Sequence, residues 1–138
     1  AALMADTIMP HLDFVSIGTN DLTQYTMAAD RLSPQLAYLT DPWQPAVLRL
    51  IQHTCVVGRD NNVPVGVCGE AAADPMLACV LTGLGVTSLS AASTAVAGVG
   101  AQLAELTFEQ CEKMAEAAVN AESPSEARSA VIALLEEF

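Results

Sequence analysis

The same local pattern occurs twice in this sequence: a short run of β-forming residues, a turn of small and polar residues, then helix-forming residues. The first occurrence is DFVSIGTNDLTQYTMAADR, residues 13–31, and the second is VPVGVCGEAAA, residues 63–73. Apolar runs of this length predict buried strands. Glycine beside short polar residues predicts a sharp exit from the strand, at Gly18 for example, into a helix. The pattern therefore indicates an α/β protein with polar side chains at the carboxyl ends of its strands.

Three parallel strands are expected in all, at about 13–17, 65–68 and 86–90, alternating with helices. The chain has 138 residues, whereas a complete (β/α)8 barrel has about 200 or more. We therefore expect residues 1–138 to form the C-terminal portion, about three β/α units, of a TIM-type (β/α)8 barrel. Three strands cannot close a barrel, so their open edges predict that the chain associates with itself, exchanges elements between copies, or is partly disordered.

Prolines, capping residues and apolar spacing indicate the helices. Asp74 and Thr107 are expected to cap the helices that follow them, and Ser123-Pro124 begins the last helix. Tyr25 is expected to be partly buried on the first helix after a strand. The predicted helices cover residues 1–11, 20–29, 45–60, 76–82, 93–106, 107–120 and 124 onward.

Residues 32–43 contain two prolines and no helical pattern, so they are expected to form a loop over the carboxyl ends of the strands. Trp43, the only tryptophan, is expected to anchor this loop by packing.

The turn after the first predicted strand carries residue types that suit an anion and a metal ion. In parallel α/β folds, ligands bind where strand ends and helix N-termini converge. Asp21 offers a carboxylate to a divalent cation, Asn20 can hydrogen-bond an oxyanion, and Arg31 can clamp a phosphate. The alternative is that Asn20 and Asp21 only cap the helix and that Arg31 is a solvated charge.

Cys68 ends the second predicted strand, where it is expected to lie at the same rim. A lone cysteine is often a small buried hydrophobic residue, but a strand end flanked by Gly66 and Gly69 favours a reactive thiol. Ser88 and Ser90 end the third strand at this rim and are weaker candidates for a polar contact.

The net charge is −11 and the five basic residues are scattered, which argues against nucleic acid and anionic membranes as partners. The four cysteines form no CxxC pair and no signal peptide is present, which favours a reducing cytoplasm over disulfides or zinc. The uncharged stretch 75–104 is interrupted by many Gly, Ser and Thr residues and lacks the sustained apolar run of a membrane-spanning helix.

Two longer phrases carry a resemblance to a known family. SIGTNDLTQYTMAADR, residues 16–31, together with VCGEAAADP, residues 67–75, resembles the phosphoenolpyruvate-utilising enzymes, and most closely Enzyme I of the bacterial sugar phosphotransferase system. Pyruvate phosphate dikinase and phosphoenolpyruvate synthase share similar turns. The resemblance extends through nearly the whole chain.

The resemblance implies a role for each candidate. Asn20 is implied to contact the phosphate of phosphoenolpyruvate, Asp21 to bind both this substrate and Mg²⁺, and Arg31 to bind the departing phosphate. Cys68 is implied to be the catalytic acid that protonates the methylene carbon of the enolate. A small phosphocarrier protein is the implied partner of the full-length enzyme, in sugar uptake.

The family also uses a second glutamate ligand for magnesium and arginines from earlier strands, and no residue here matches them. The chain is therefore expected to be the C-terminal part of a larger enzyme and to be inactive alone. The resemblance implies a homodimer or other self-association. Two alternatives remain: a non-catalytic oligomerisation or interaction fragment, and part of an enzyme like pyruvate phosphate dikinase or phosphoenolpyruvate synthase.

Overall fold

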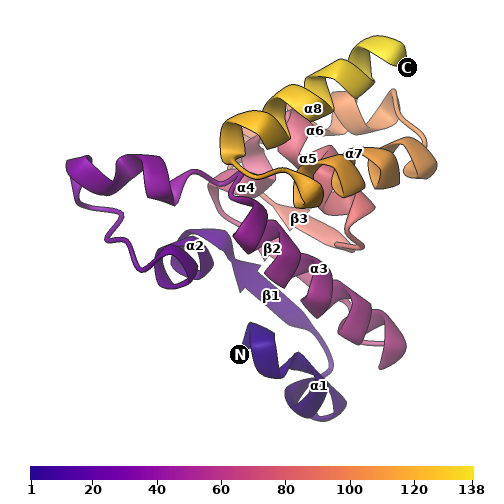
Figure 1. The fold of residues 1–138 in the computed structure, drawn as a ribbon. Coiled ribbons are helices and arrows are strands. Elements are labelled where there is room, and N and C mark those ends of the chain that lie inside the picture. The colour runs from indigo at the N-terminus through magenta and orange to yellow at the C-terminus, as the bar shows by residue number, and fades with distance from the viewer.

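A three-stranded parallel sheet lies at the centre of the computed structural model, which describes residues 1–138. The strands are β1 (Val15–Gly18), β2 (Val65–Cys68) and β3 (Ser88–Ser90), in the order β1-β2-β3. The predicted parallel strands are confirmed, and β2 has the predicted bounds. The mixed α/β architecture, in which helices alternate with the strands, is consistent with a partial β/α barrel (Figure 1).

β1 and β3 begin two residues later than predicted, at Val15 and Ser88. The Val86 N–H donates to the carbonyl of Leu81 at 3.1 Å, so Val86 closes the preceding helix instead of pairing with β2.

Helical elements connect the strands and form the part of the chain that follows β3 (Figure 1). In chain order they are η1 (Ala2–Met4), α1 (Ala5–Ile8), η2 (Met9–His11), α2 (Thr19–Met27), η3 (Pro34–Thr40), α3 (Pro45–Asp60), α4 (Glu70–Ala73), α5 (Pro75–Gly83), α6 (Ser93–Ala104), α7 (Phe108–Asn120) and α8 (Pro124–Glu137). Here η denotes a 3-10 helix. None of these helices is both long enough and apolar enough to cross a lipid bilayer.

Local sequence signals set the helix starts, as expected. The carboxylate of Asp74 accepts hydrogen bonds from the Met76 and Leu77 N–H groups at 3.0 and 3.1 Å. Thr107 forms a capping box with Gln110 at the start of α7, and the Ser123 hydroxyl caps α8. These bonds satisfy N–H groups that the first turn of a helix leaves without an intrahelical partner.

Three predictions about local structure are wrong. Residues 2–11 form two 3-10 turns and a short α-helix, not one helix. Residues 34–40 form a 3-10 helix where a loop was expected. Tyr25 is 79% exposed, because its side of α2 faces away from the core.

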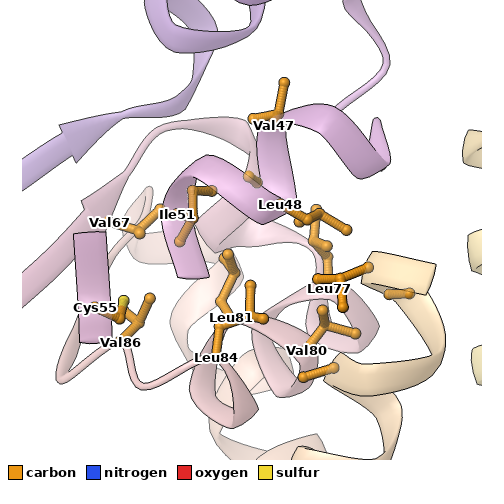
Figure 2. Packing of buried hydrophobic residues seen from close by; sticks show 14 of the residues in the cluster. Val47, Leu48, Ile51, Cys55, Val67, Leu77, Val80, Leu81, Leu84 and Val86 are labelled. Atoms are coloured by element: carbon orange, nitrogen blue, oxygen red, sulfur yellow. The ribbon is translucent and has the colours of Figure 1, made fainter. Parts of the chain in front are cut away.

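The core lies between the sheet and one layer of helices (Figure 2). α3 contributes Val47, Leu48 and Ile51 to the buried cluster and α5 contributes Leu77 and Leu81, and all of them are almost fully buried. Burial of apolar surface contributes about 25 cal/mol per Å², so this layer supplies most of the driving force for folding.

α5 and α7 approach each other closely at Gly83. A Cβ atom at this position would overlap the backbone of Cys111 and Glu112, so only glycine fits here. The helices beyond the last strand are therefore part of the same packed unit as the sheet.

The two faces of the sheet differ. Ile17, Val65 and Val67 are buried against the helices. Because side chains alternate along a strand, the intervening residues lie on the opposite face. This face carries two rows of small residues aligned by the strand register: Ser16, Gly66 and Ser88 in one, and Gly18, Cys68 and Ser90 in the other.

Both edges of the sheet are free of a further strand, since β1 and β3 each pair only with β2. A mostly apolar groove of about 440 Å³ lies beside β1, between the N-terminal segment and α2. A second groove of about 330 Å³ lies beside β3, against α6.

Candidate functional site

The turn after β1 leads directly into α2. Gly18 is the N-cap and has φ −82° and ψ 99°, an extended conformation that any residue can adopt. The expected role of Gly18 in a tight turn is therefore wrong. The first helical residue, Thr19, is buried, and its hydroxyl donates a hydrogen bond to the carbonyl of Cys68 at 3.2 Å. This bond joins the turn after β1 to the turn after β2.

Asn20 and Asp21 lie in the first turn of α2 with exposed side chains. No side chain caps this helix, so the alternative in which these two residues serve as caps is wrong. Their amide and carboxylate groups are left available for other partners. A helix N-terminus also carries a partial positive charge and free N–H groups, which attract anions.

The turn after β2 is the place where glycine is required. Gly69 has φ +102°, a conformation that L side chains rarely adopt. A Cβ atom here would lie 3.2 Å from the Thr19 hydroxyl oxygen and 3.9 Å from Oδ1 of Asn20. The side chain of Asn20 therefore lies beside the backbone that follows Cys68, and the two turns form one continuous rim.

Cys68 is the half-exposed cysteine of the chain, whereas Cys55, Cys79 and Cys111 are buried. The Cys68 thiol donates to the carbonyl of Ile17 at 3.5 Å. Burial raises the pKa of Cys55 and of Cys79 from 9.0 to about 12, and it also raises the pKa of Cys111. Of the four thiols, Cys68 alone lies where a ligand at the strand ends can reach it.

Arg31 lies beyond the C-terminal end of α2 and turns back toward the start of this helix. Its Nη1 atom is 3.9 Å from Oδ1 of Asp21, and both side chains are largely exposed. The Arg31 N–H donates to Oε1 of Gln24 at 3.4 Å. A pair this long and this exposed contributes little to stability, so both groups can turn to an incoming anion or cation.

The predicted site residues are therefore joined in two contacts. Asn20 lies against the turn that carries Cys68, and Asp21 pairs with Arg31. Both contacts start from the same helical turn, since Asn20 and Asp21 are adjacent.

The carboxylate of Asp21 suits a hard cation that takes its remaining ligands from water and substrate. No group of three or more His, Cys, Asp or Glu side chains converges anywhere in the chain. Mg²⁺ is commonly held by one or two carboxylates together with water and substrate phosphates. Asp21 is thus able to supply one ligand of such a shell.

Thr19 was not among the predicted site residues, although it bridges the two turns. Its position directly after the strand, one residue before Asn20, is the only sequence signal for this role. Ser90, a weaker candidate, is in register with Cys68 and lies in the same row of the sheet face.

Comparison with known proteins identifies the family of this chain. Residues 1–108 match the family model described as "PEP-utilising enzyme, PEP-binding domain". The chain belongs to this family of phosphoenolpyruvate-utilising enzymes, which confirms the resemblance found in the sequence.

The curated relatives include phosphoenolpyruvate-protein phosphotransferases. The protein of that name from Streptomyces coelicolor is 52% identical over 135 residues, which is 98% of this chain and 24% of the relative. The one from Bacillus sp. (strain S) is 45% identical over 116 residues, 84% of this chain and 20% of the relative. A multiphosphoryl transfer protein from Rhodobacter capsulatus is 44% identical over 128 residues, 93% of this chain and 16% of the relative. The chain thus spans about a quarter or less of these relatives.

Proposed function

We propose that this chain forms part of the phosphoenolpyruvate site of a phosphoenolpyruvate-protein phosphotransferase of the cytoplasm. Such an enzyme transfers phosphate from phosphoenolpyruvate to one of its own histidines and on to a small phosphocarrier protein in sugar uptake. The observation that carries the proposal is the junction of the two turns, in which Thr19 binds the Cys68 carbonyl and Asn20 lies beside Gly69. The names of the relatives favour this activity over that of a dikinase.

Each residue has a defined task in this proposal. Asn20 hydrogen-bonds a phosphate oxygen, Arg31 leaves Asp21 to bind the phosphate, and Asp21 binds Mg²⁺. A Mg²⁺ ion held there would supply positive charge to neutralise the phosphate, and phosphoryl transfer depends chiefly on such neutralisation and on positioning.

Cys68 donates the proton to carbon in this proposal. When the phosphoryl group leaves for the histidine, the substrate becomes the enolate of pyruvate. The Cys68 thiol donates its proton to the methylene carbon, which gives pyruvate and a thiolate, and the thiolate regains a proton from solvent. The half-exposed position of Cys68 on the small-residue face of the sheet gives substrate and solvent access to it.

The partial barrel belongs to the same proposal. The two free edges of the sheet and the apolar grooves beside them suit further β/α units of a (β/α)8 barrel. The 138-residue chain alone is then expected to bind phosphoenolpyruvate weakly and not to turn it over, because Asp21 is the only carboxylate ligand that it supplies for the metal.

The test is an NMR titration of the chain with phosphoenolpyruvate in the presence of Mg²⁺. We expect shift changes at residues 18–21 and 68–70, and about tenfold weaker binding in both Asn20→Ala and Asp21→Asn, since hydrogen bonds to charged groups contribute about 1.5–3 kcal/mol. Asp60→Asn, at the far end of α3, is the matched control and should bind normally. Shift changes elsewhere, or an Asp21→Asn variant that binds normally, would contradict the proposal.

The alternative function, oligomerisation without catalysis, is not favoured, because the relatives are phosphoenolpyruvate-protein phosphotransferases. Under that alternative the chain forms dimers or larger species in analytical ultracentrifugation and shows no shift changes with phosphoenolpyruvate. Self-association together with specific shift changes at the two turns would support both functions.

A further inference from the structure

The segment 32–44, here named the rim segment, joins α2 to α3 and extends away from the sheet (Figure 1). No residue of its 3-10 helix η3 is buried. Most of its hydrogen bonds are internal, such as Leu36 N–H to the Ser33 carbonyl at 3.0 Å and Thr40 to the Ala37 carbonyl at 3.0 Å. A segment with so little buried surface opens locally at low free energy unless its ends are held.

The C-terminal end of the rim segment is held by Trp43, which is fully buried. The indole N–H donates to Oδ2 of Asp74 at 3.2 Å, while the other oxygen of Asp74 caps α5. Asp74 directly follows α4, the helical turn that begins after Cys68 and Gly69. Trp43 therefore ties the rim segment to the same stretch of chain that carries the proposed acid.

Arg128 of α8 also contacts this end of the rim segment. The Arg128 guanidinium lies 5.5 Å from the centroid of the Trp43 ring, and its Nη2 atom is 3.7 Å from Oδ1 of Asp41. That same oxygen accepts a hydrogen bond from the Trp43 backbone N–H at 2.9 Å. Arg128 thus contacts both the ring of Trp43 and the carboxylate that orients its backbone. It lies outside residues 1–108, the part of the chain that matches the family model.

We propose that Arg128 is a positioning residue for the phosphate site, which it stabilises through Trp43, Asp41 and the rim segment. The inference rests on the proposed function, because the other end of the rim segment directly follows Arg31, which that function assigns to phosphate binding. A planar guanidinium suits this position, since it is able to stack on an indole and pair with a carboxylate at once. Holding residues 41–43 limits the conformations of the rim segment and therefore those of Arg31.

The experiment compares Arg128→Ala with Arg59→Ala, a matched control. Arg59 also pairs with an aspartate, Asp60, at 3.4 Å, but it lies at the opposite end of α3 and contacts neither Trp43 nor the rim. Hydrogen exchange is followed by mass spectrometry in peptides that cover residues 32–44. Phosphoenolpyruvate binding in Mg²⁺ is followed by NMR, together with the indole N–H resonance of Trp43.

Arg128→Ala is expected to speed exchange in the rim segment by about threefold to tenfold, as loss of one cation–π contact and one partly exposed ion pair implies. Phosphoenolpyruvate binding should weaken by a similar factor, and the Trp43 indole resonance should shift. Exchange in β1 and β2 should stay unchanged. Arg59→Ala should match the wild type in every measurement.

Two further variants separate the contacts of Arg128. Asp41→Asn removes the ion pair but keeps an oxygen for the Trp43 N–H, so its effect should be smaller than that of Arg128→Ala. Arg128→Lys keeps the charge without the planar group and should restore part of the protection.

Unchanged exchange in the rim segment of Arg128→Ala, or equally faster exchange throughout the sheet, would overturn the positioning role. So would faster rim exchange with unchanged phosphoenolpyruvate affinity. Failure of the wild-type chain to bind phosphoenolpyruvate would instead overturn the proposed function, and the exchange data alone would then decide whether Arg128 holds the rim segment.

Discussion

The helical layer and the strand-end turns of this protein differ in how their side chains are held. Leu48, Leu77 and Leu81 are fully enclosed, while Asn20 and Asp21 are exposed and lack the capping bonds that such residues commonly make. The first region provides the free energy of folding, and the second leaves polar groups available for a ligand. Substitutions in the two regions should therefore affect different measurements.

Leu48→Ala should have the largest effect. Removing this buried side chain from α3 leaves a cavity between α3 and α5, and we expect the free energy of unfolding to fall by about 3–5 kcal/mol. Asn20→Ala should change it by less than about 0.5 kcal/mol, because exposed residues contribute little. Urea unfolding measures both, and equal losses in the two variants would contradict the division between the regions.

Gly83→Ala should have the second largest effect on the free energy of unfolding. Its Cβ overlaps the backbone of α7, so α5 and α7 must separate, and we expect a loss of about 2–3 kcal/mol or more. Gly100→Ala in α6 is the control, because no atom lies within 4 Å of its Cβ position. That substitution should raise stability by up to about 1 kcal/mol, since alanine favours a helix. Thermal unfolding compares the two variants, and similar melting temperatures would show that α5 and α7 adjust freely.

Alkaline pH should weaken the helical layer specifically. The unfolded chain releases the thiol protons of Cys55 and Cys79 near pH 9.0, whereas burial raises their pKa to about 12 in the folded protein. The folded state therefore binds more protons in this range, and its stability falls as pH rises from 9 toward 12. At full effect each thiol contributes a slope of about 1.4 kcal/mol per pH unit.

Urea unfolding at pH 8, 9 and 10 measures this slope. Cys55→Ala should make the pH dependence of the free energy of unfolding less steep by the contribution of one thiol, even though it lowers stability at every pH. An unchanged slope in this variant would show that the Cys55 thiol is not responsible.

Cys68→Ser should have the smallest effect on stability, within about 0.5 kcal/mol, because the side chain is half exposed and small. Its effect should appear in thiol labelling. In the native wild-type chain a reagent such as 5,5′-dithiobis(2-nitrobenzoate) should modify one thiol quickly and the others only after unfolding, and Cys68→Ser should lose the fast phase. Fast labelling that persists in Cys68→Ser would place an accessible thiol elsewhere.

Sequence reasoning succeeded where local residues decide the structure. The short apolar run Val65–Cys68 forms a strand, and Asp74 and Thr107 cap their helices as predicted. The parallel order of the strands also followed from the alternation of strands and helices. The approach of the two turns could be expected because parallel strands end at the same edge.

Other features depend on contacts between distant residues, which no local pattern encodes. Gly18 adopts an ordinary extended conformation, and the positive φ occurs at Gly69 instead. The bond from Thr19 to the Cys68 carbonyl spans 49 residues, and the Arg128 contact with Trp43 joins parts of the chain far apart in sequence. The roles of Asn20, Asp21, Arg31 and Cys68 in binding and chemistry remain predictions that the titrations above address.

The close packing of α5 on α7 also bears on where this domain can be divided. The family model ends at residue 108, yet the Arg49 side chain of α3 donates to the Val119 carbonyl of α7 at 2.7 Å, and the backbone of Cys111 lies against Gly83. A shortened protein that ends at residue 108 would lack α7 and α8, which contribute buried residues to the core. The packed core of the protein therefore extends past the residues that the family model matches.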